Sequence, residues 1–262
     1  MVYICSSTKI TFQLRYFIKL AYKGTNYHGW QYQPNAITIQ ELVNKALSTL
    51  LKSKIDIVGA GRTDAGVHAT EYYAHFDVDK EIKTEELVYK ANSMLPNDIV
   101  IYTVFKTNDE LHARFDATSR SYEYHIYLGR NPFKIDTTWQ IISKKLDIEA
   151  MNVAAKLLLN YENFKSFSRS NTDVRTYNCK IKNAIWKLNE TNLIFYITAD
   201  RFLRNMVRAV VGTLINIGTG KTTIDEFKKI IESKNRSNAG PSVPAKGLFL
   251  TKITYPKNTI NE

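Results

Sequence analysis

The sequence predicts an α+β fold made of two similar halves. Segments in which apolar and polar residues alternate, as in half-buried strands, are separated by segments whose apolar residues recur at helical spacing. The predicted order of the first half is strand, helix, strand, strand, helix, strand, and a comparable series begins near Ala117. A chain of 262 residues suits one or two domains and is long enough to bury a sizeable core.

The first half is expected over residues 8–116. Thr38 and Glu41 have the spacing of a capping box, which predicts that a helix begins immediately after Thr38. This order of elements is the ferredoxin-like arrangement, which gives an RRM-like sheet. The expected strands cover residues 12–22, 55–58, 72–78 and 99–105, and the expected helices cover residues 39–51 and 84–94.

The second half is expected over residues 117–256. Residues 189–192 form a predicted hairpin turn, and Gly218 is predicted to end the longest helix. We expect the two halves to form one mixed, mainly antiparallel sheet with helices on one side and a central cleft between the halves. The expected strands cover residues 121–127, 175–188, 193–199 and 248–254, and the expected helices cover residues 148–159, 202–217 and 224–233.

Composition narrows the classes of function. The formal net charge of +11 fits a polyanionic partner, although many basic proteins bind no nucleic acid. Cys5 and Cys179 are the only cysteines and the five histidines are scattered, so we expect neither a metal site nor a disulfide framework. Residues 2–5 are too short for a signal-peptide core, and no stretch has the length of a membrane span. We therefore expect a cytoplasmic protein without a membrane partner.

The most informative stretch is the eleven residues from Gly59 to Ala69, GAGRTDAGVHA. The preceding apolar residues predict a strand, and the glycines predict a tight loop that another molecule can approach closely. A carboxylate beside an arginine stays ionised, so Asp64 next to Arg62 suits a nucleophile or charge stabiliser better than a general acid. The alternative is a surface turn in which Asp64 caps a backbone N–H and pairs with Arg62.

Two further groups have both a structural and a functional interpretation. Arg201, Arg204 and Arg208 fall on one face of the expected helix, either as a solvated basic stripe or with a buried arginine that needs an acidic partner. Tyr122 is either a core tyrosine of a sheet face or an aromatic platform at the cleft. The loop over residues 23–31 is either a turn packed by Trp30 or a loop that contacts substrate.

The stretch GRTDAGVHA at 61–69 resembles the catalytic loop of the tRNA pseudouridine synthase A family. Similar segments occur in the family's order from about Leu14 to Leu250: YKGTNYHGWQ at 22–31, FKSFS at 164–168, NMVRAVVGTL at 205–214 and AGPSVPAKGL at 239–248. The resemblance implies isomerisation of uridine to pseudouridine without a cofactor. It implies a tRNA partner, uridines at about positions 38–40 of the anticodon arm, and a homodimer.

The resemblance also implies roles for individual residues. Asp64 is expected to act as nucleophile or base, with Arg208 as its partner. Arg62 is expected to help hold the displaced nucleotide, and Tyr122 to support the extruded base. His68 is expected to be a structural residue that hydrogen-bonds to backbone. Candidate contacts to the RNA backbone are Lys144, Lys145, Lys165, Arg169, Arg175 and Lys246.

Three alternatives were weighed against this interpretation. The first is a synthase of the same fold that acts on another RNA site, which would share the active-site residues. The second is a non-catalytic RNA-binding protein, against which the set of Arg62, Asp64 and Tyr122 argues. The third, metal-dependent hydrolysis through Asp64 and His68, lacks further ligands at a sensible spacing.

Overall fold

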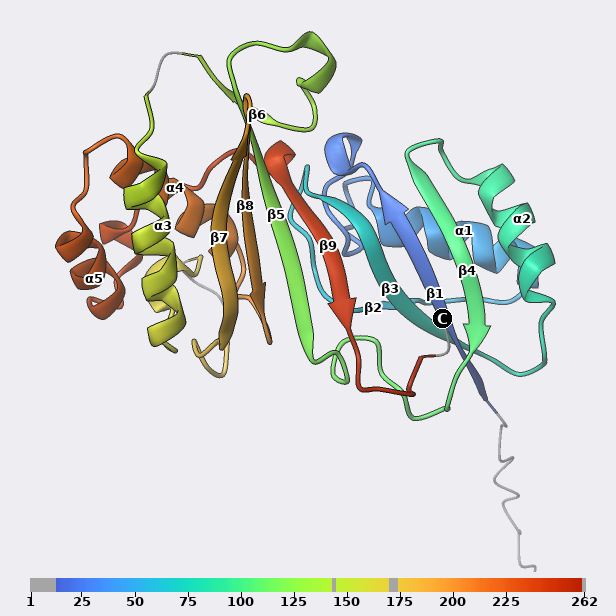
Figure 1. Ribbon diagram of the computed structural model, residues 1–262. Helices are drawn as coiled ribbons and strands as arrows, with labels where there is room; N and C mark the ends of the chain where they lie inside the picture. Colours follow the sequence, from blue (N-terminus) through green and yellow to red (C-terminus); the bar gives the residue numbers. More distant parts are fainter. Residues whose placement is uncertain (1–12, 143–144, 170–173, 261–262) are drawn as a thin grey trace, which may run out of the picture.

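The structure is a computed structural model that describes residues 13–142, 145–169 and 174–260. In these ranges nine strands form one mixed sheet in the order β4-β1-β3-β9-β5-β8-β7, with β2 beside β3 and β6 beside β5. Five α-helices pack against one side of the sheet (Figure 1). The predicted α+β fold with two similar halves is confirmed. None of the helices in the described ranges is both long and apolar enough to span a membrane.

The amino-terminal part of the sheet is antiparallel. Helix α1 begins after Thr38, whose hydroxyl accepts a hydrogen bond from the Glu41 N–H at 3.4 Å, as the capping pattern predicts. The bounds of both helices match the predicted ranges. The elements are β1 (Leu14–Tyr22), α1 (Ile39–Leu51), β2 (Val58–Gly59), β3 (His68–Val78), α2 (Thr84–Met94) and β4 (Ile99–Lys106).

The strand predicted over residues 55–58 is almost entirely absent. Ile55 and Ile57 are buried, but their backbone N–H groups donate to side chains of α1, namely Ser48 Oγ at 2.9 Å and Asn44 Oδ1 at 2.9 Å. These side chains replace a neighbouring strand, so only Val58 and Gly59 pair with β3.

The carboxy-terminal part follows the same plan. Its elements are β5 (Ser119–Leu128), β6 (Trp139–Ile141), α3 (Ile148–Leu157), β7 (Ile181–Asn189), β8 (Asn192–Ala199), α4 (Met206–Gly218), α5 (Ile224–Glu232) and β9 (Leu248–Thr254). The predicted hairpin is present as β7 and β8. Strand β7 begins at Ile181 rather than at 175, and the short strand β6 was not predicted.

Helix α4 begins later than predicted. Asn205 has φ of 66°, in the left-handed region, and helical hydrogen bonding starts only at Met206. A left-handed residue cannot lie inside an α-helix, so residues 202–205 precede the helix, and a turn closed by the Met206 N–H and the Leu203 carbonyl at 3.0 Å leads into it. The predicted helical stripe of Arg201, Arg204 and Arg208 is therefore wrong, because only Arg208 lies on the helix.

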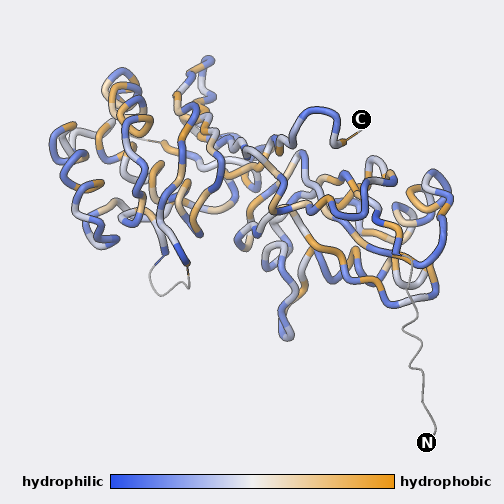
Figure 2. The backbone as a smooth tube through the Cα atoms, turned by 90° about the horizontal axis from the view of Figure 1, so that it is seen from below, coloured by the Kyte–Doolittle hydropathy of each residue, from blue (hydrophilic) through white to orange (hydrophobic). Residues whose placement is uncertain are grey.

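The two parts meet at a short parallel pairing between β3 and β9. His68 pairs with Phe249 and Ala69 with Leu250, whereas farther along β3 the neighbour is β2. The buried side chains form two clusters, one in each part, and Tyr122 packs against both. Figure 2 shows the two parts toward opposite ends of the molecule with a narrower junction between them. The loop that carries Asp64 enters β3 at this junction.

Candidate active site

The loop between β2 and β3 is held in place by its backbone. The Ala60 N–H donates to the Tyr73 carbonyl at 2.9 Å, the Gly66 N–H to the Tyr27 carbonyl at 3.2 Å, and the Trp30 N–H to the Thr63 carbonyl at 3.2 Å. Since these bonds use main-chain atoms, the loop keeps its shape without engaging the Asp64 side chain.

Two glycines of this loop are required by geometry. A Cβ at Gly59 would lie 2.2 Å from the Tyr72 hydroxyl and 2.5 Å from the Trp30 indole, and Gly66 has φ of 77°. Gly61 differs, because a Cβ there would meet no atom within 4 Å. The space beside Gly61 is therefore open.

The loop over residues 23–31 packs against the Asp64 loop. Trp30 is buried, and its ring lies 4.1 Å from the ring of Tyr72. Gly29, with φ of 90°, leaves room for the Thr63 carbonyl, which would lie 2.4 Å from a Cβ. The interpretation of this segment as a turn packed by Trp30 is confirmed, and its packing shapes the neighbouring loop.

The carboxylate of Asp64 lies between two arginines of the other half. Its Oδ1 lies 3.7 Å from Nε of Arg204, and its Oδ2 lies 3.7 Å from Nη1 of Arg208. These distances allow charge attraction but exceed hydrogen-bond length. Within the described part of the chain no hydrogen-bond donor reaches either oxygen, so both keep their lone pairs available. The predicted pairing of Asp64 with Arg208 is present, and Arg204 is a second partner that the sequence did not indicate.

Arg208 is fixed by a segment near the carboxyl end of the chain. Its Nε donates to the Val243 carbonyl at 2.7 Å, and the Val243 N–H donates to the Arg208 carbonyl at 3.3 Å. This segment approaches α4 closely because Gly212 lacks a Cβ, which would lie 1.8 Å from the Pro241 oxygen. This part of the segment at residues 239–248 thus orients Arg208.

Arg62 does not pair with Asp64, which corrects one expectation. The carboxylate's ion-pair partners in the described ranges are Arg204 and Arg208, whereas Arg62 is exposed and lines a neighbouring pocket. The side chains of these two residues therefore have different neighbours.

Tyr122 lies at the junction of the two hydrophobic clusters. Its ring meets that of Phe202 edge-on, with centroids 5.1 Å apart and planes at 87°. Burial raises the pKa of Tyr122 to about 12; the charge of Arg120 lowers it and that of Asp64 raises it. Tyr122 is therefore a neutral, half-buried aromatic residue whose pKa is affected by the charge of Asp64.

Arg120 is a supporting residue that the sequence analysis did not identify. Its guanidinium donates to four carbonyl oxygens, those of Ala60 at 3.1 Å, Arg114 at 2.6 Å, Ala117 at 2.8 Å and Asp200 at 2.9 Å. Its burial lowers the pKa of Arg120. It ties the Asp64 loop to the turn before β5 and to the end of β8.

His68 has the predicted structural role. Its Nδ1 accepts a hydrogen bond from the Gly24 N–H at 3.0 Å, and its Nε2 lies 3.0 Å from the Lys246 carbonyl. Because Nδ1 is the acceptor, Nε2 carries the proton and donates. Burial lowers the pKa of His68, which favours this neutral form.

The predicted backbone-binding cations are scattered over the surface. Lys145, Lys165, Arg169 and Arg175 are exposed, Lys246 is half-buried, and Lys144 lies outside the described residues. The Lys165 ammonium lies 5.5 Å from the centroid of the Tyr177 ring. Their contacts with RNA stay predictions.

Among the described residues Asp64 accepts no hydrogen bond, and it lies beside two arginines and close to Tyr122 at the junction of the two-part sheet, an arrangement suited to nucleophilic or base chemistry. The family model described as tRNA pseudouridine synthase matches residues 19–116 and 154–256. The chain belongs to this family, and it is an isomerase.

Individual relatives agree with this assignment. The chain is 50% identical over 245 residues to a Bacteroides fragilis protein named tRNA pseudouridine synthase A, covering 93% of this chain and 97% of the relative. It is 49% identical over 246 residues to the protein of that name from Parabacteroides distasonis, covering 93% and 96%. A Thermoanaerobacter protein of the same name is 40% identical over 241 residues, covering 91% and 98%.

Proposed function

We propose that the chain converts uridine to pseudouridine in the anticodon stem-loop of tRNA, at about positions 38–40, with Asp64 as the reacting carboxylate. The observation that carries the proposal is the pair of 3.7 Å contacts, which leave both Asp64 oxygens unengaged between two cations. The names of the relatives support a tRNA substrate, and the position in the anticodon arm rests on the family resemblance alone.

The reaction rearranges one nucleotide without redox change or net hydrolysis. The bond from ribose C1′ to N1 of the base breaks, a bond from C1′ to C5 forms, the proton on C5 is lost, and N1 gains a proton. Asp64 is suited to attack the sugar, to add to the base, or to remove a proton in a glycal route, and all three need an ionised carboxylate. Arg204 and Arg208 each place a positive charge 3.7 Å from one of its oxygens.

The target uridine must leave the stacked stem for its glycosidic bond to be reached. We assign Tyr122 as the surface that supports the extruded base, because it is aromatic, neutral and close enough to Asp64 for the charges to interact. Arg62, exposed two residues before Asp64, is placed to hold the displaced strand through its phosphates.

The resemblance also supports a homodimer that works in the cytoplasm. Light scattering of the purified protein tests the first point: a mass of about twice 30.1 kDa supports the dimer, and a mass of one chain contradicts it. The division into parts at residues 8–116 and 117–256 is likewise proposed, and limited proteolysis that cuts near residue 116 supports it.

The product position tests the proposed activity. A tRNA transcript is incubated with the wild-type protein or with Asp64→Asn, and pseudouridines are located by carbodiimide adducts that stop reverse transcription. Stops in the anticodon arm with wild type alone support the proposal. Stops elsewhere indicate a synthase for another RNA site, and binding without stops indicates a non-catalytic RNA-binding protein.

A further inference from the structure

A pocket of about 310 Å³ lies beside the Asp64 loop and does not include Asp64 itself. Gly59, Gly61 and Arg62 line it from the loop, and residues of the segment before β5 line it from the other side. From that segment Phe115 contributes a side chain that is 75% exposed. Of its lining residues, the mechanism above uses only Arg62.

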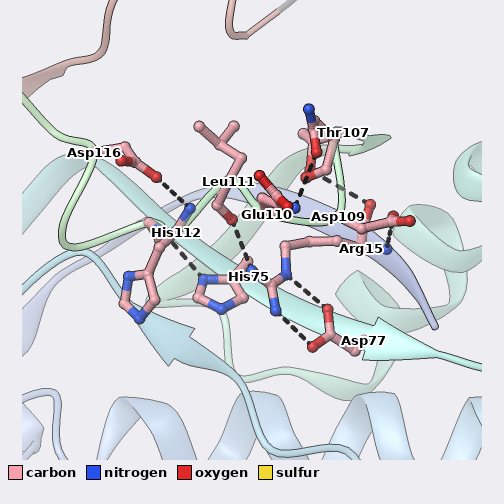
Figure 3. A network of polar contacts seen from close by, with 11 residues as sticks. Arg15, His75, Asp77, Thr107, Asp109, Glu110, Leu111, His112 and Asp116 are labelled. Carbon is pink, nitrogen blue, oxygen red and sulfur yellow. Dashed lines mark hydrogen bonds and ion pairs between the residues drawn. The ribbon is translucent and has the colours of Figure 1, made fainter.

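The segment that presents Phe115 is rigid. The Nδ1 of His112 accepts hydrogen bonds from the N–H groups of Arg114 at 3.0 Å and Phe115 at 3.3 Å, and the Asp116 carboxylate accepts from the His112 N–H at 2.7 Å. Figure 3 shows Asp116 and His112 in this turn, with the His112 ring beside that of His75. The conformation is thus set by local bonds before any ligand arrives.

The Phe115 ring rests on a column of rings that reaches the core. The ring centroids of Phe115 and His112 are 4.2 Å apart, and those of His112 and His75 are 4.7 Å apart. The His75 ring lies 5.8 Å from the ring of the fully buried Phe17. One face of Phe115 is therefore supported by His112, while most of its surface stays open to solvent.

Two arginines lie beside this open aromatic surface or line its pocket, which the carboxylate of Asp56 also lines. The guanidinium of Arg114 lies 5.7 Å from the Phe115 centroid, and Arg62 lines the same pocket. The amides of Gln31 and Gln40 on the pocket wall bond to each other at 2.9 Å. Because Nδ1 of His112 is an acceptor, its Nε2 is a donor. An exposed ring with two arginines and a free N–H matches the chemistry of a nucleotide, which offers a base face and a phosphate.

We propose that this pocket binds a second nucleotide of the RNA, adjacent to the target uridine, with its base stacked on Phe115 and its phosphate paired with Arg62 and Arg114. Arg62 and Asp64 are two residues apart, at most about 7 Å between Cα atoms, so occupants of the two sites are neighbours on one strand. Arg120 bonds to both Ala60 and Arg114 and so fixes the spacing of the two sites. The inference rests on the proposed function, since it takes the RNA bound at Asp64 as its ligand.

The test pairs Phe115 variants with tRNAs that lack one base. Phe115→Ala is expected to lower both tRNA affinity and tritium release from uridine C5 at subsaturating tRNA by roughly 5- to 150-fold, the range for one stacked base. Phe115→Tyr is expected to behave like wild type, and Phe115→Leu, which keeps apolar area without a ring, like Phe115→Ala. An abasic nucleotide beside the target uridine is expected to lower the affinity of the wild-type protein for tRNA by a similar factor. It is expected to lower the affinity of Phe115→Ala by no more than about twofold.

Controls separate stacking from folding. Tyr89→Ala removes a side chain of nearly equal exposure, 76%, from helix α2 and is expected to leave affinity, turnover and melting temperature unchanged. The inference is overturned if Phe115→Ala equals wild type, if Phe115→Leu retains full affinity, or if no flanking abasic site couples to Phe115. If the wild-type protein binds tRNA but releases no tritium, the proposed activity is contradicted. The coupling between Phe115→Ala and the abasic nucleotide, measured as tRNA affinity, still tests the role of the pocket.

Discussion

Two aspartates, Asp77 and Asp64, contact arginine with different geometry although their side chains are similarly exposed. In the Arg15–Asp77 contact, Nε and Nη2 of the arginine each donate to one carboxylate oxygen at 2.8 Å (Figure 3). In the Asp64 contacts with Arg204 and Arg208, the closest approach is 3.7 Å. The exposed fraction is 27% for the Asp77 side chain and 25% for that of Asp64.

The difference is the one expected between a structural carboxylate and the reacting carboxylate that we propose for Asp64. Bidentate hydrogen bonds occupy the oxygens of Asp77 and lower its pKa. At Asp64 the arginines supply charge while leaving the oxygens free for substrate. Arg208 keeps this distance because its Nε is bound to the Val243 carbonyl instead. Under the proposed function, the same two residue types thus serve stability at one place and chemistry at the other.

Among the residues that surround Asp64, Arg208 should have the largest effect on turnover when it is removed. We expect Arg208→Met to lower the rate of tritium release at saturating tRNA by roughly 100-fold, since it removes the more buried of the two cations beside Asp64. Arg204→Met serves as the comparison, because its side chain is 58% exposed, and we expect a loss of about tenfold or less. A greater loss for Arg204→Met would reverse the proposed division between the two arginines.

The network around Asp77 should make stability depend on pH. Burial, with the charge of Arg15 adding to it, lowers the pKa of His75 from 6.5 to about 4. Between these values the unfolded chain binds a proton that the folded chain does not, so the stability present above pH 6.5 falls as the pH drops toward 4, by about 2–3 kcal/mol.

His75→Asn is the matched variant for this prediction. Its side-chain oxygen can accept the hydrogen bond that His75 Nδ1 receives from the Ala113 N–H at 3.1 Å, but it does not titrate. Urea unfolding between pH 4 and 7 should show a shallower pH dependence for this variant. Identical slopes for both proteins would contradict the assignment to His75.

Arg120 links the Asp64 loop to the carboxy-terminal part of the sheet. Its loss should destabilise the folded protein without abolishing turnover. Arg120→Met leaves four carbonyl oxygens without their donor, and we expect a loss of about 2 kcal/mol in unfolding free energy. Turnover should fall less than for Arg208→Met, because the Asp64 loop keeps its other backbone bonds. Denaturant midpoints and tritium release on the same preparation test both statements.

Asp77→Asn should have the smallest effect. The pair with Arg15 is partly exposed, so we expect a loss of only about 1 kcal/mol in stability, which is present above the usual aspartate pKa and disappears as the pH falls through the lowered value. Turnover per folded molecule should not change. A loss of turnover would show that this contact also shapes the active site.

Local sequence patterns predicted much of the fold. The cap at Thr38 placed α1, and alternating apolar residues placed β1 and β5 close to their observed bounds, whereas β3 begins at His68, four residues before the predicted start. The start of α4 was missed because apolar spacing continues through residues 202–205, while the left-handed turn at Asn205 leaves no mark in that pattern.

The site was predicted in part. The pairing of Asp64 with Arg208 followed from the family resemblance, because the two residues come from different halves of the chain. Arg204 and Arg120 were missed, since their roles depend on how loops from both halves meet. Phe115 was missed for another reason. The sequence alone does not show whether a phenylalanine is exposed or buried, and the exposure of Phe115 is seen only in the folded chain.

The most direct test of this account is single-turnover tritium release from uridine C5 by Asp64→Asn and Asp77→Asn in parallel, each with its tRNA affinity. We predict a rate at least about 1,000-fold lower for Asp64→Asn with nearly unchanged affinity, and a wild-type rate for Asp77→Asn. Substantial release by Asp64→Asn, or equal losses of rate and affinity in that variant, would contradict the claim that the carboxylate left free of hydrogen bonds performs the chemistry.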